Sequence, residues 1–384
     1  MKRHILLCSL LIATCYLLPA LDAGLVLDQN LAYSGSGDDA AFEFNGILVP
    51  RISGLLGNNG KFFVSGGLNY QNEPWGFIPE LIEADFFFGF YGGSFRLGRS
   101  AYQDPLGFVV DGFFDGARLV LDTPAGVFSA AAMYAGFICK RRANIEMTAN
   151  EYNYNNAAIE YDDFFNTYFA PSRAIAALEW EHPQISRHLR LKLSAIGQFD
   201  LADLTEEQLN SQYFIAKMTL PFSVFSLEAG GCFNLIQFAG KDETAFAAEL
   251  GLNWFWRNQG LSLLARYSSG YSGDITPFVP VTTVKQGNVF STSLVGMTVF
   301  SMDYSVRLHR TLSFNFLPAY FIDNYDDDSS GLLGGEVFGK LNWAPVSDIL
   351  FTVGGGVFLP SLGNVTPDAN PVWRGEMNIV ISLF

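Results

Sequence analysis

Cysteine is scarce in this sequence, and its few occurrences exclude two common kinds of site. Only 4 of the 384 residues are cysteines. Cys8 and Cys15 lie in the apolar N-terminal run, which leaves Cys139 and Cys232 far apart in the rest of the chain. This spacing matches neither a zinc site nor a disulfide framework. The two thiols could still pair in an oxidising compartment, because sequence alone does not place them relative to each other.

Charged residues and histidines are also few. Charged residues make up 16% of the chain, and the histidines beyond the N-terminus are His182, His188 and His309, all at predicted turns. An enzyme needs a base and a nucleophile close together, and a nucleic-acid-binding protein needs a basic surface. The sequence predicts neither, so we expect no enzymatic activity, no cofactor, no metal site and no nucleic-acid partner.

Long apolar runs are absent beyond residue 23. This excludes membrane-spanning helices, because each needs about 20 predominantly apolar residues in succession. Pro- or Ser-rich linkers and changes of composition are absent too, so we expect residues 24–384 to form a single domain.

The first 23 residues have the pattern of an export signal. Lys2 and Arg3 form a basic start, the mainly apolar run 5–21 follows, and Ala23 provides a small residue before Gly24. We expect cleavage near Ala23 and regard a lipid anchor at Cys15 as the alternative.

Aromatic residues and glycine are abundant instead. The chain has 36 Phe, 16 Tyr and 38 Gly, and its mean hydropathy is +0.19 despite a net charge of −15. In the segment 246–256 the apolar set is Phe246, Ala248, Leu250, Leu252, Trp254 and Trp256, and the set between them includes Glu249, Gly251 and Asn253. This period of two is typical of a β-strand, whereas a helical period of 3.6 would scatter the two sets around the axis.

About eighteen segments alternate in this way, including 81–92, 94–102, 126–139 and 288–308. Tight turns and longer polar loops alternate between them with few exceptions. This arrangement is typical of an outer-membrane barrel. The sequence therefore predicts an all-β protein, a transmembrane antiparallel up-and-down β-barrel of about 18 (16–18) strands. A soluble sandwich or propeller also alternates, but the export signal and the loop pattern favour the membrane barrel.

The faces opposite the lipid should line the lumen. We expect charged side chains of both signs there, and a barrel of this size leaves room for an aqueous path. The candidate lumen-lining residues are Arg96, Arg118, Arg190, Lys192, Glu228, Glu249, Arg266, Asp303, Arg307, Glu336 and Lys340. Opposed charges could create a constriction, or the same residues could form structural ion pairs between neighbouring strands.

Two loops are distinctive. Lys140–Ala170 is the longest, and it either folds into the lumen or lies over the mouth of the barrel. Its stretch Tyr152–Phe169 is rich in Phe and Tyr and is the only candidate for an apolar ligand pocket. Asp323–Asp328 is acidic but lacks the glycine and the distal glutamate of a helical calcium loop, so a solvated loop is expected.

Two stretches resemble known families. Trp373–Phe384 resembles the last strand of outer-membrane barrels, which ends on an aromatic residue read by the barrel assembly machinery, although Phe384 has the opposite parity to the apolar set. Phe95–Leu121 contains Arg96-Leu97-Gly98-Arg99 and Phe114-Asp115-Gly116-Ala117-Arg118-Leu119, and resembles a hairpin of the alginate-export-type channels. That resemblance implies an 18-stranded barrel with a charged lumen, in which Arg96 and Arg118 are the matching inward arginines.

Together these features predict an outer-membrane, porin-like channel for passive diffusion of small hydrophilic, possibly anionic, solutes. The expected partners are outer-membrane lipids, the barrel assembly machinery and the solutes, and the oligomeric state is left open. Two alternatives remain, a structural or adhesive barrel with a plugged lumen and a gated transporter of an apolar ligand.

Overall fold

The computed structural model describes residues 21–37, 39–72, 75–186, 188–201, 208–271, 275–325 and 331–383. Residues 1–20 of the predicted export signal lie outside these ranges, as do residues 326–330 of the acidic loop and the terminal Phe384. No helix among the described residues has the length and apolar composition needed to cross a membrane.

The described residues form one sheet of eighteen strands. The first nine are β1 (Leu21–Ser36), β2 (Asp39–Leu56), β3 (Gly60–Asn72), β4 (Trp75–Phe90), β5 (Gly93–Gln103), β6 (Asp111–Thr123), β7 (Gly126–Tyr134), β8 (Arg173–Ser186) and β9 (Leu189–Asp200). The second nine are β10 (Leu209–Pro221), β11 (Phe225–Phe238), β12 (Lys241–Trp256), β13 (Gln259–Ser268), β14 (Met297–His309), β15 (Leu312–Asp323), β16 (Gly331–Val346), β17 (Ile349–Leu359) and β18 (Val372–Leu383). The helices within the described ranges are α2 (Lys140–Ala143), α3 (Ala149–Asn156), α4 (Phe164–Tyr168) and the 3-10 helix η1 (Pro360–Leu362).

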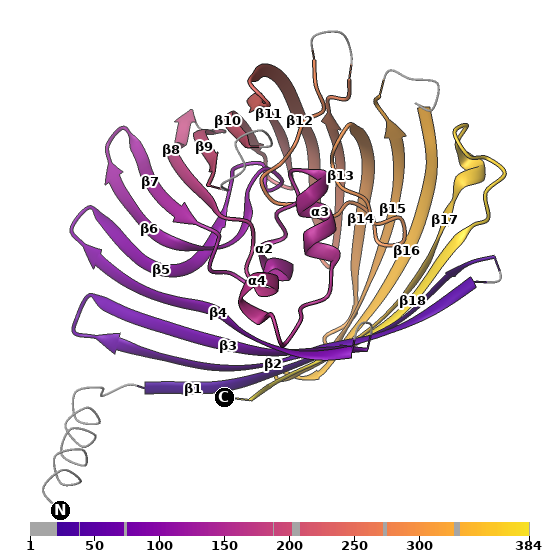
Figure 1. Ribbon diagram of the computed structural model, residues 1–384, viewed down its shortest axis with the longest axis horizontal. Coiled ribbons are helices and arrows are strands. Elements are labelled where there is room, and N and C mark those ends of the chain that lie inside the picture. The colour runs from indigo at the N-terminus through magenta and orange to yellow at the C-terminus, as the bar shows by residue number, and fades with distance from the viewer. Residues whose placement is uncertain are drawn as a thin grey trace, which may run out of the picture.

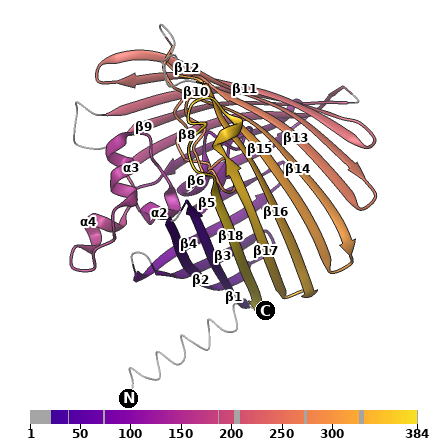
Figure 2. The ribbon, with the colours of Figure 1, turned by 90° about the vertical axis from the view of Figure 1, so that its right-hand side faces the viewer.

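Each strand pairs antiparallel with the next, and β1 also pairs with β18, from Leu25 opposite Leu383 to Ser36 opposite Val372. This last ladder closes the sheet into the ring seen in Figures 1 and 2. The prediction of a closed antiparallel barrel with about 18 strands is therefore confirmed. Closure leaves no exposed sheet edge between the first and last strands.

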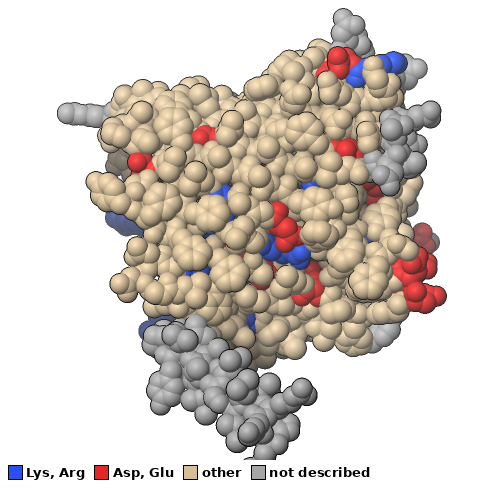
Figure 3. All heavy atoms as spheres, turned by 60° about the vertical axis from the view of Figure 1, so that its left-hand side comes forward, with Lys and Arg blue, Asp and Glu red and all other residues tan. Residues whose placement is uncertain are grey.

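The period-two pattern sorts the side chains between the two faces of the wall. On β12, Phe246 and Leu250 are exposed on the outer face, whereas Ala247 and Glu249 are buried on the inner face. The same holds around the ring, and Figure 3 shows one side of the molecule as mostly uncharged, with a small group of charged side chains near its centre. An apolar outer face with a polar inner face is what a barrel in lipid requires.

Tight turns join the strands at one end of the barrel, the turn end, and the longer connections lie at the opposite loop end. Three loop-end connections enter the lumen: the 104–110 loop, the 135–172 loop that carries α2, α3 and α4, and the 269–296 loop, of which residues 272–274 lie outside the described ranges. The helices α2, α3 and α4 fall within the ring of strands in Figure 1, and α3 and α4 lie at one end of the barrel in Figure 2.

Two predicted strands are shorter than their alternation indicated. The segment 126–139 leaves the sheet after Tyr134, and the segment 288–308 enters it only at Met297. In both cases the missing residues belong to loops that pack inside the barrel, where buried apolar side chains take the place of lipid-facing ones. Ile138 and Leu294, for example, are almost completely buried. Alternation alone does not distinguish these two kinds of apolar environment.

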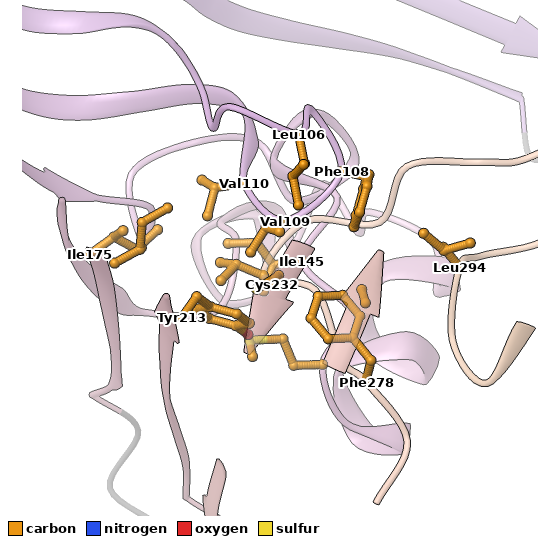
Figure 4. Packing of buried hydrophobic residues seen from close by; sticks show 14 of the residues in the cluster. Leu106, Phe108, Val109, Val110, Ile145, Ile175, Tyr213, Cys232, Phe278 and Leu294 are labelled. Carbon is orange, nitrogen blue, oxygen red and sulfur yellow. The ribbon is translucent and has the colours of Figure 1, made fainter. Parts of the chain in front are cut away.

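The main hydrophobic core lies inside the lumen rather than between layers. Figure 4 shows how Leu106, Phe108, Val109 and Val110 of the 104–110 loop converge with Ile145, Phe278 and Leu294 of the other two loops. These residues pack against Ile175, Tyr213 and Cys232, which project inward from the wall strands β8, β10 and β11. The loops thus fill one side of the lumen with apolar side chains.

Candidate functional site: a loop-lined chamber in the lumen

The predicted lumen residues lie on the inner face of the wall, and most of them form ion pairs there. The largest network runs across four strands. Lys217 Nζ lies 3.0 Å from Glu228 Oε2 and 3.1 Å from Glu249 Oε1, and Arg266 Nε lies 3.0 Å from Glu249 Oε2. Arg266 also donates to Gln286 of the 269–296 loop. The network therefore joins the wall to a loop.

Three further predicted cations pair in the same way. Arg96 contacts Asp85 at 3.1 Å, Lys192 contacts Glu181 at 2.9 Å, and Lys340 contacts Glu376 at 3.3 Å. The structural interpretation of these side chains thus has direct geometric support, whereas their effect on permeation stays a prediction.

Arg118 belongs to a more crowded cluster on the inner wall. Its guanidinium lies 2.9 Å from Glu179 Oε2, and the same carboxylate accepts hydrogen bonds from Ser129 and Tyr102. Arg118 stands directly opposite Arg96 in the β5–β6 register. Two arginines so placed repel each other unless each has its own carboxylate, and Asp85 and Glu179 supply these.

The remaining predicted residues differ in their surroundings. Asp303 accepts a hydrogen bond from Asn315 at 3.3 Å. Arg190 and Arg307 lie close to the turn end, and neither forms an ion pair with any of the described residues.

Glu336 is distinctive because it binds backbone rather than a cation. Its two carboxylate oxygens accept hydrogen bonds from the N–H groups of Asn288, Val289 and Phe290 at 2.7, 3.0 and 2.9 Å. Glu336 is 2% exposed. A wall carboxylate therefore anchors the 269–296 loop, and the tight bend there uses Gly287 in the left-handed region at φ +80°.

Asp104 organises the 104–110 loop in a similar way. Its carboxylate accepts four backbone N–H groups of its own loop, at 2.7 to 3.1 Å. Burial raises the pKa of Asp104, and the four N–H donors oppose this shift. The loop then reaches across the lumen, since the Arg266 guanidinium lies 5.3 Å from the centre of the Phe108 ring.

The 135–172 loop is held by buried ion pairs. Arg173 has a fully buried side chain that contacts Glu151 on α3 and Asp200 at 3.2 Å. The helix α3 begins with a capping box between Thr148 and Glu151. Lys140 donates to the Tyr154 carbonyl at 2.7 Å, and burial lowers its pKa.

Backbone hydrogen bonds join the three loops into one body. Val281 N–H donates to the Val109 carbonyl at 2.8 Å, and Thr283 N–H donates to the Asn144 carbonyl at 2.9 Å. From sequence, the 140–170 region could either fold into the lumen or lie over the mouth. Its N-terminal part, with Ile145 and Met147 buried in the core, packs inside, whereas Tyr152, Tyr161 and Phe165 are exposed.

Between this loop body and the opposite wall remains a chamber of about 830 Å³. Amide side chains project toward it from the wall, namely Asn30, Asn45, Asn69, Gln71 and Asn378. The loops contribute Arg141, Arg142, Asn144 and Lys285. Arg142 pairs with Glu80, but Arg141 and Lys285 form no ion pair with another described residue. The chamber therefore presents two loop cations without an ion-pair partner, Arg141 and Lys285, opposite the wall amides, and its lining also includes two carboxylates without an ion-pair partner among the described residues, Asp28 and Asp111.

A second lumen cavity, of about 690 Å³, continues along the same strands toward the turn end. It is lined by Ser53, Lys61, Glu83, Asp85 and Arg96, among others. The two cavities lie end to end along β2, β3 and β4, on the side of the lumen that the apolar loops leave free.

Sequence reasoning missed the residues of the chamber. The wall amides occupy alternate positions, as Asn69 and Gln71 do on β3, so the alternation along the strand could have predicted that they face inward. The sequence did not predict which side of the barrel the loops leave open, because this depends on contacts between distant segments. The two cysteines, which could have paired as far as the sequence shows, are both free and buried. No group of His, Cys, Asp and Glu in the described ranges has an arrangement suited to a metal ion.

Comparison with solved structures places this architecture among outer-membrane porins. OccK2 (OpdF) of Pseudomonas aeruginosa, solved in complex with glucuronate, is similar with a TM-score of 0.68 and 11% sequence identity, over 96% of this chain and 99% of that one. The chain has the porin fold.

Two further porins are similar. OpdK of the same organism, solved with vanillate, has a TM-score of 0.65 at 9% identity, over 96% of this chain and 99% of that one. OccAB4 of Acinetobacter baumannii has a TM-score of 0.61 at 11% identity, over 95% and 98%. No family model and no curated protein matches the sequence. The resemblance of Phe95–Leu121 to the alginate-export-type channels gains no support from these comparisons.

Proposed function

We propose that the protein is an outer-membrane channel through which small hydrophilic solutes, anions among them, diffuse passively. The observation that carries the proposal is the pair of lumen cavities aligned along β2, β3 and β4, with polar walls and an apolar loop body on the other side. An aqueous path needs hydrogen-bonding groups along its length, because a permeating solute gives up part of its hydration.

The two unpaired loop cations of the chamber support the passage of anions. Arg141 and Lys285 lie on the loop side of the chamber, so an entering carboxylate meets two cations there, while Asp28 and Asp111 elsewhere in the lining keep the chamber open to other hydrophilic solutes. The similar porins OccK2 and OpdK were solved with glucuronate and vanillate, which are both carboxylates. A hydroxylated carboxylate would match the amides of the wall as well as the cations of the loops.

Reconstitution into planar bilayers tests the proposal. We expect stepwise conductance, with anions carrying part of the current in a salt gradient. The double substitution Arg141→Glu and Lys285→Glu should shift the reversal potential toward cations, whereas Lys241→Glu, at the outer end of β12 and outside the chamber lining, should not. Folded protein without conductance steps would instead support a plugged structural or adhesive barrel.

We also propose how the chain reaches the outer membrane and how it is oriented there. Residues 1–23 direct export and are removed, residues 24–384 form the single barrel domain, and the tight turns face the periplasm. The barrel assembly machinery recognises the last strand, β18, and the longer loops face outward. Truncating the chain after residue 371 should abolish insertion, which the yield of folded protein in outer-membrane fractions measures.

A further inference from the structure

The barrel wall is interrupted at the loop end between β4 and β5. The β4–β5 ladder runs only from Ala84 opposite Arg99 to Phe90 opposite Gly93, so residues 75–83 of β4 pair with β3 alone. Beyond Arg99, the β5–β6 hairpin turns into the lumen, where Tyr102 and Phe114 are almost completely buried. We call the resulting gap beside residues 75–83 the side window.

Side chains take the place of a neighbouring strand along this free edge. Tyr161 Oη accepts from the Phe77 N–H and donates to the Phe77 carbonyl, both at 2.7 Å. Tyr168 Oη donates to the Pro79 carbonyl at 2.8 Å, and Arg99 donates to the Leu81 carbonyl at 2.6 Å. Pro79 has no N–H to offer, and proline is confined to strand edges of this kind.

A single layer of polypeptide chain closes the window. We call residues 135–139 and 157–170 the cover. Phe137 of the cover is 61% exposed on the outside, whereas Cys139, two residues further on, is 3% exposed and lines the chamber. The cover packs on β4 through a small cluster of its own, formed by Ile78, Cys139, Ile159 and Tyr168 and separate from the main core.

The window reaches into the lipid layer. Residues 84–90 of β4, which pair with β5, extend about 18 Å along the barrel axis at the usual rise per residue and tilt of a strand. The apolar band of an outer-membrane barrel is about 25 Å tall. The lower part of the window therefore faces acyl chains, as the exposed Leu81 indicates.

At its lower border the window carries an ion pair on the outer face. Arg99 and Asp115 share the outward parity of Leu97 and Leu119, and the Arg99–Asp115 contact measures 2.8 Å. Charged groups toward lipid are costly unless they have a function or several partners. Arg99 has these partners in Asp115, Leu81 and the Phe137 carbonyl of the cover, and so it fastens the hairpin, β4 and the cover together.

We propose that the side window is a lateral port through which small amphiphiles with an acidic group pass between the chamber and the outer leaflet. The acidic group would meet Arg141 in the chamber, and the apolar part would replace contacts of Ile78 and Tyr168 as the cover moves aside. The proposal rests on the chamber being a solute path, and it adds a second entrance to that path.

Alkylation of the two native cysteines tests the port. Cys139 belongs to the cover, and Cys232 lies behind the loop body in the main core, so it serves as an internal control. The full barrel in liposomes is treated either with N-dodecylmaleimide dissolved in the bilayer or with a sulfonated, membrane-impermeant maleimide in the water. Mass spectrometry then gives the rate of modification at each thiol.

The variant Tyr161→Phe with Tyr168→Phe removes the hydroxyls that hold the cover on β4. Losing three such hydrogen bonds shifts the opening equilibrium roughly tenfold or more. We expect the bilayer-borne reagent to modify Cys139 about tenfold faster in this variant, with the aqueous reagent unchanged and Cys232 unreactive. Tyr152→Phe, an exposed tyrosine on α3, is the matched control and should behave like the wild type.

Three outcomes would overturn the port: an unchanged rate with the bilayer-borne reagent, an equal increase with both reagents, or equal modification of Cys232. If the double variant fails to fold, Tyr168→Phe alone provides the same comparison. The conductance of the wild type is measured separately. A barrel that labels from the bilayer without conducting would refute the channel, and one that conducts without such labelling would refute the port.

Discussion

The anchoring of the 269–296 loop by Glu336 leads to a quantitative prediction for Glu336→Gln. The carboxylate accepts three backbone N–H groups, one on Oε1 and two on Oε2. Glutamine keeps one acceptor oxygen and replaces the other by an NH₂ group, which faces N–H donors. At least one charge-assisted hydrogen bond is lost and one repulsive contact is created.

The size of the effect depends on the value of such bonds. Hydrogen bonds to charged groups contribute about 1.5–3 kcal/mol each. Loss of one bond, together with the loss of charge on the others, should weaken the anchor by about 2–3 kcal/mol, which is roughly a 30- to 150-fold change in an equilibrium. Phe290 also stacks on Phe358 with ring centres 4.4 Å apart, so we expect the loop to loosen locally rather than to leave the lumen.

Hydrogen–deuterium exchange of the peptide covering residues 286–292 measures this opening. The exchange rate of the Asn288, Val289 and Phe290 amides should rise by the same factor as the opening equilibrium, and single-channel currents should become noisier. Asp303→Asn is the matched control, because Asp303 also lies on the inner wall but accepts only from Asn315 among the described contacts. Exchange as slow in Glu336→Gln as in the wild type would refute the anchoring role.

Three further predictions concern the stability of the barrel and its loops, measured by the temperature at which the heat-modifiable band unfolds. Arg173→Met should cost about 3–5 kcal/mol, because two buried carboxylates lose their cation. Asp104→Asn should loosen the 104–110 loop by about 2–4 kcal/mol and should raise the conductance. Each carboxylate oxygen of Asp104 accepts two backbone N–H groups, and asparagine keeps only one of these two acceptor oxygens. Gly98→Ala should cost at least about 2 kcal/mol, because φ is +114° and the new Cβ would lie 2.1 Å from the Ala84 carbonyl oxygen. Gly89→Ala, where the nearest atoms lie at 3.8 Å, is its control and should be nearly neutral. An unaltered unfolding temperature in any of the three variants would contradict the assigned contact.

Much of the candidate site was within reach of sequence reasoning. The inward parity of Glu228, Glu249 and Arg266 follows from alternation along single strands, and pairing of neighbouring strands then brings opposite charges together. The unpaired Arg141 and Lys285 were not within reach, since nothing local shows that their loops turn inward to face the amide wall.

Arg99 is a second residue whose contacts could not be predicted from the sequence. Its position in an alternating segment correctly gives its outward parity, next to Leu97. The alternation does not reveal that β4 lacks its neighbour at this height, so that an arginine on the outer face has a carbonyl of β4 and a carbonyl of the cover to bind. Pro79 was the one local signal of that free edge.

Local patterns in the sequence therefore suffice for the closed barrel, for a strand number of 16–18 and for the inward parity of many charged wall residues, because these depend on a period of two and on the length of successive connections. The filled side of the lumen, the position of the chamber and the opening in the wall become visible only in three dimensions. These depend on hydrogen bonds and apolar contacts between segments more than a hundred residues apart, such as Val109 with Val281 and Phe108 with Phe278. No local pattern encodes such contacts, since an apolar side chain reads the same in sequence whether it meets lipid or a loop.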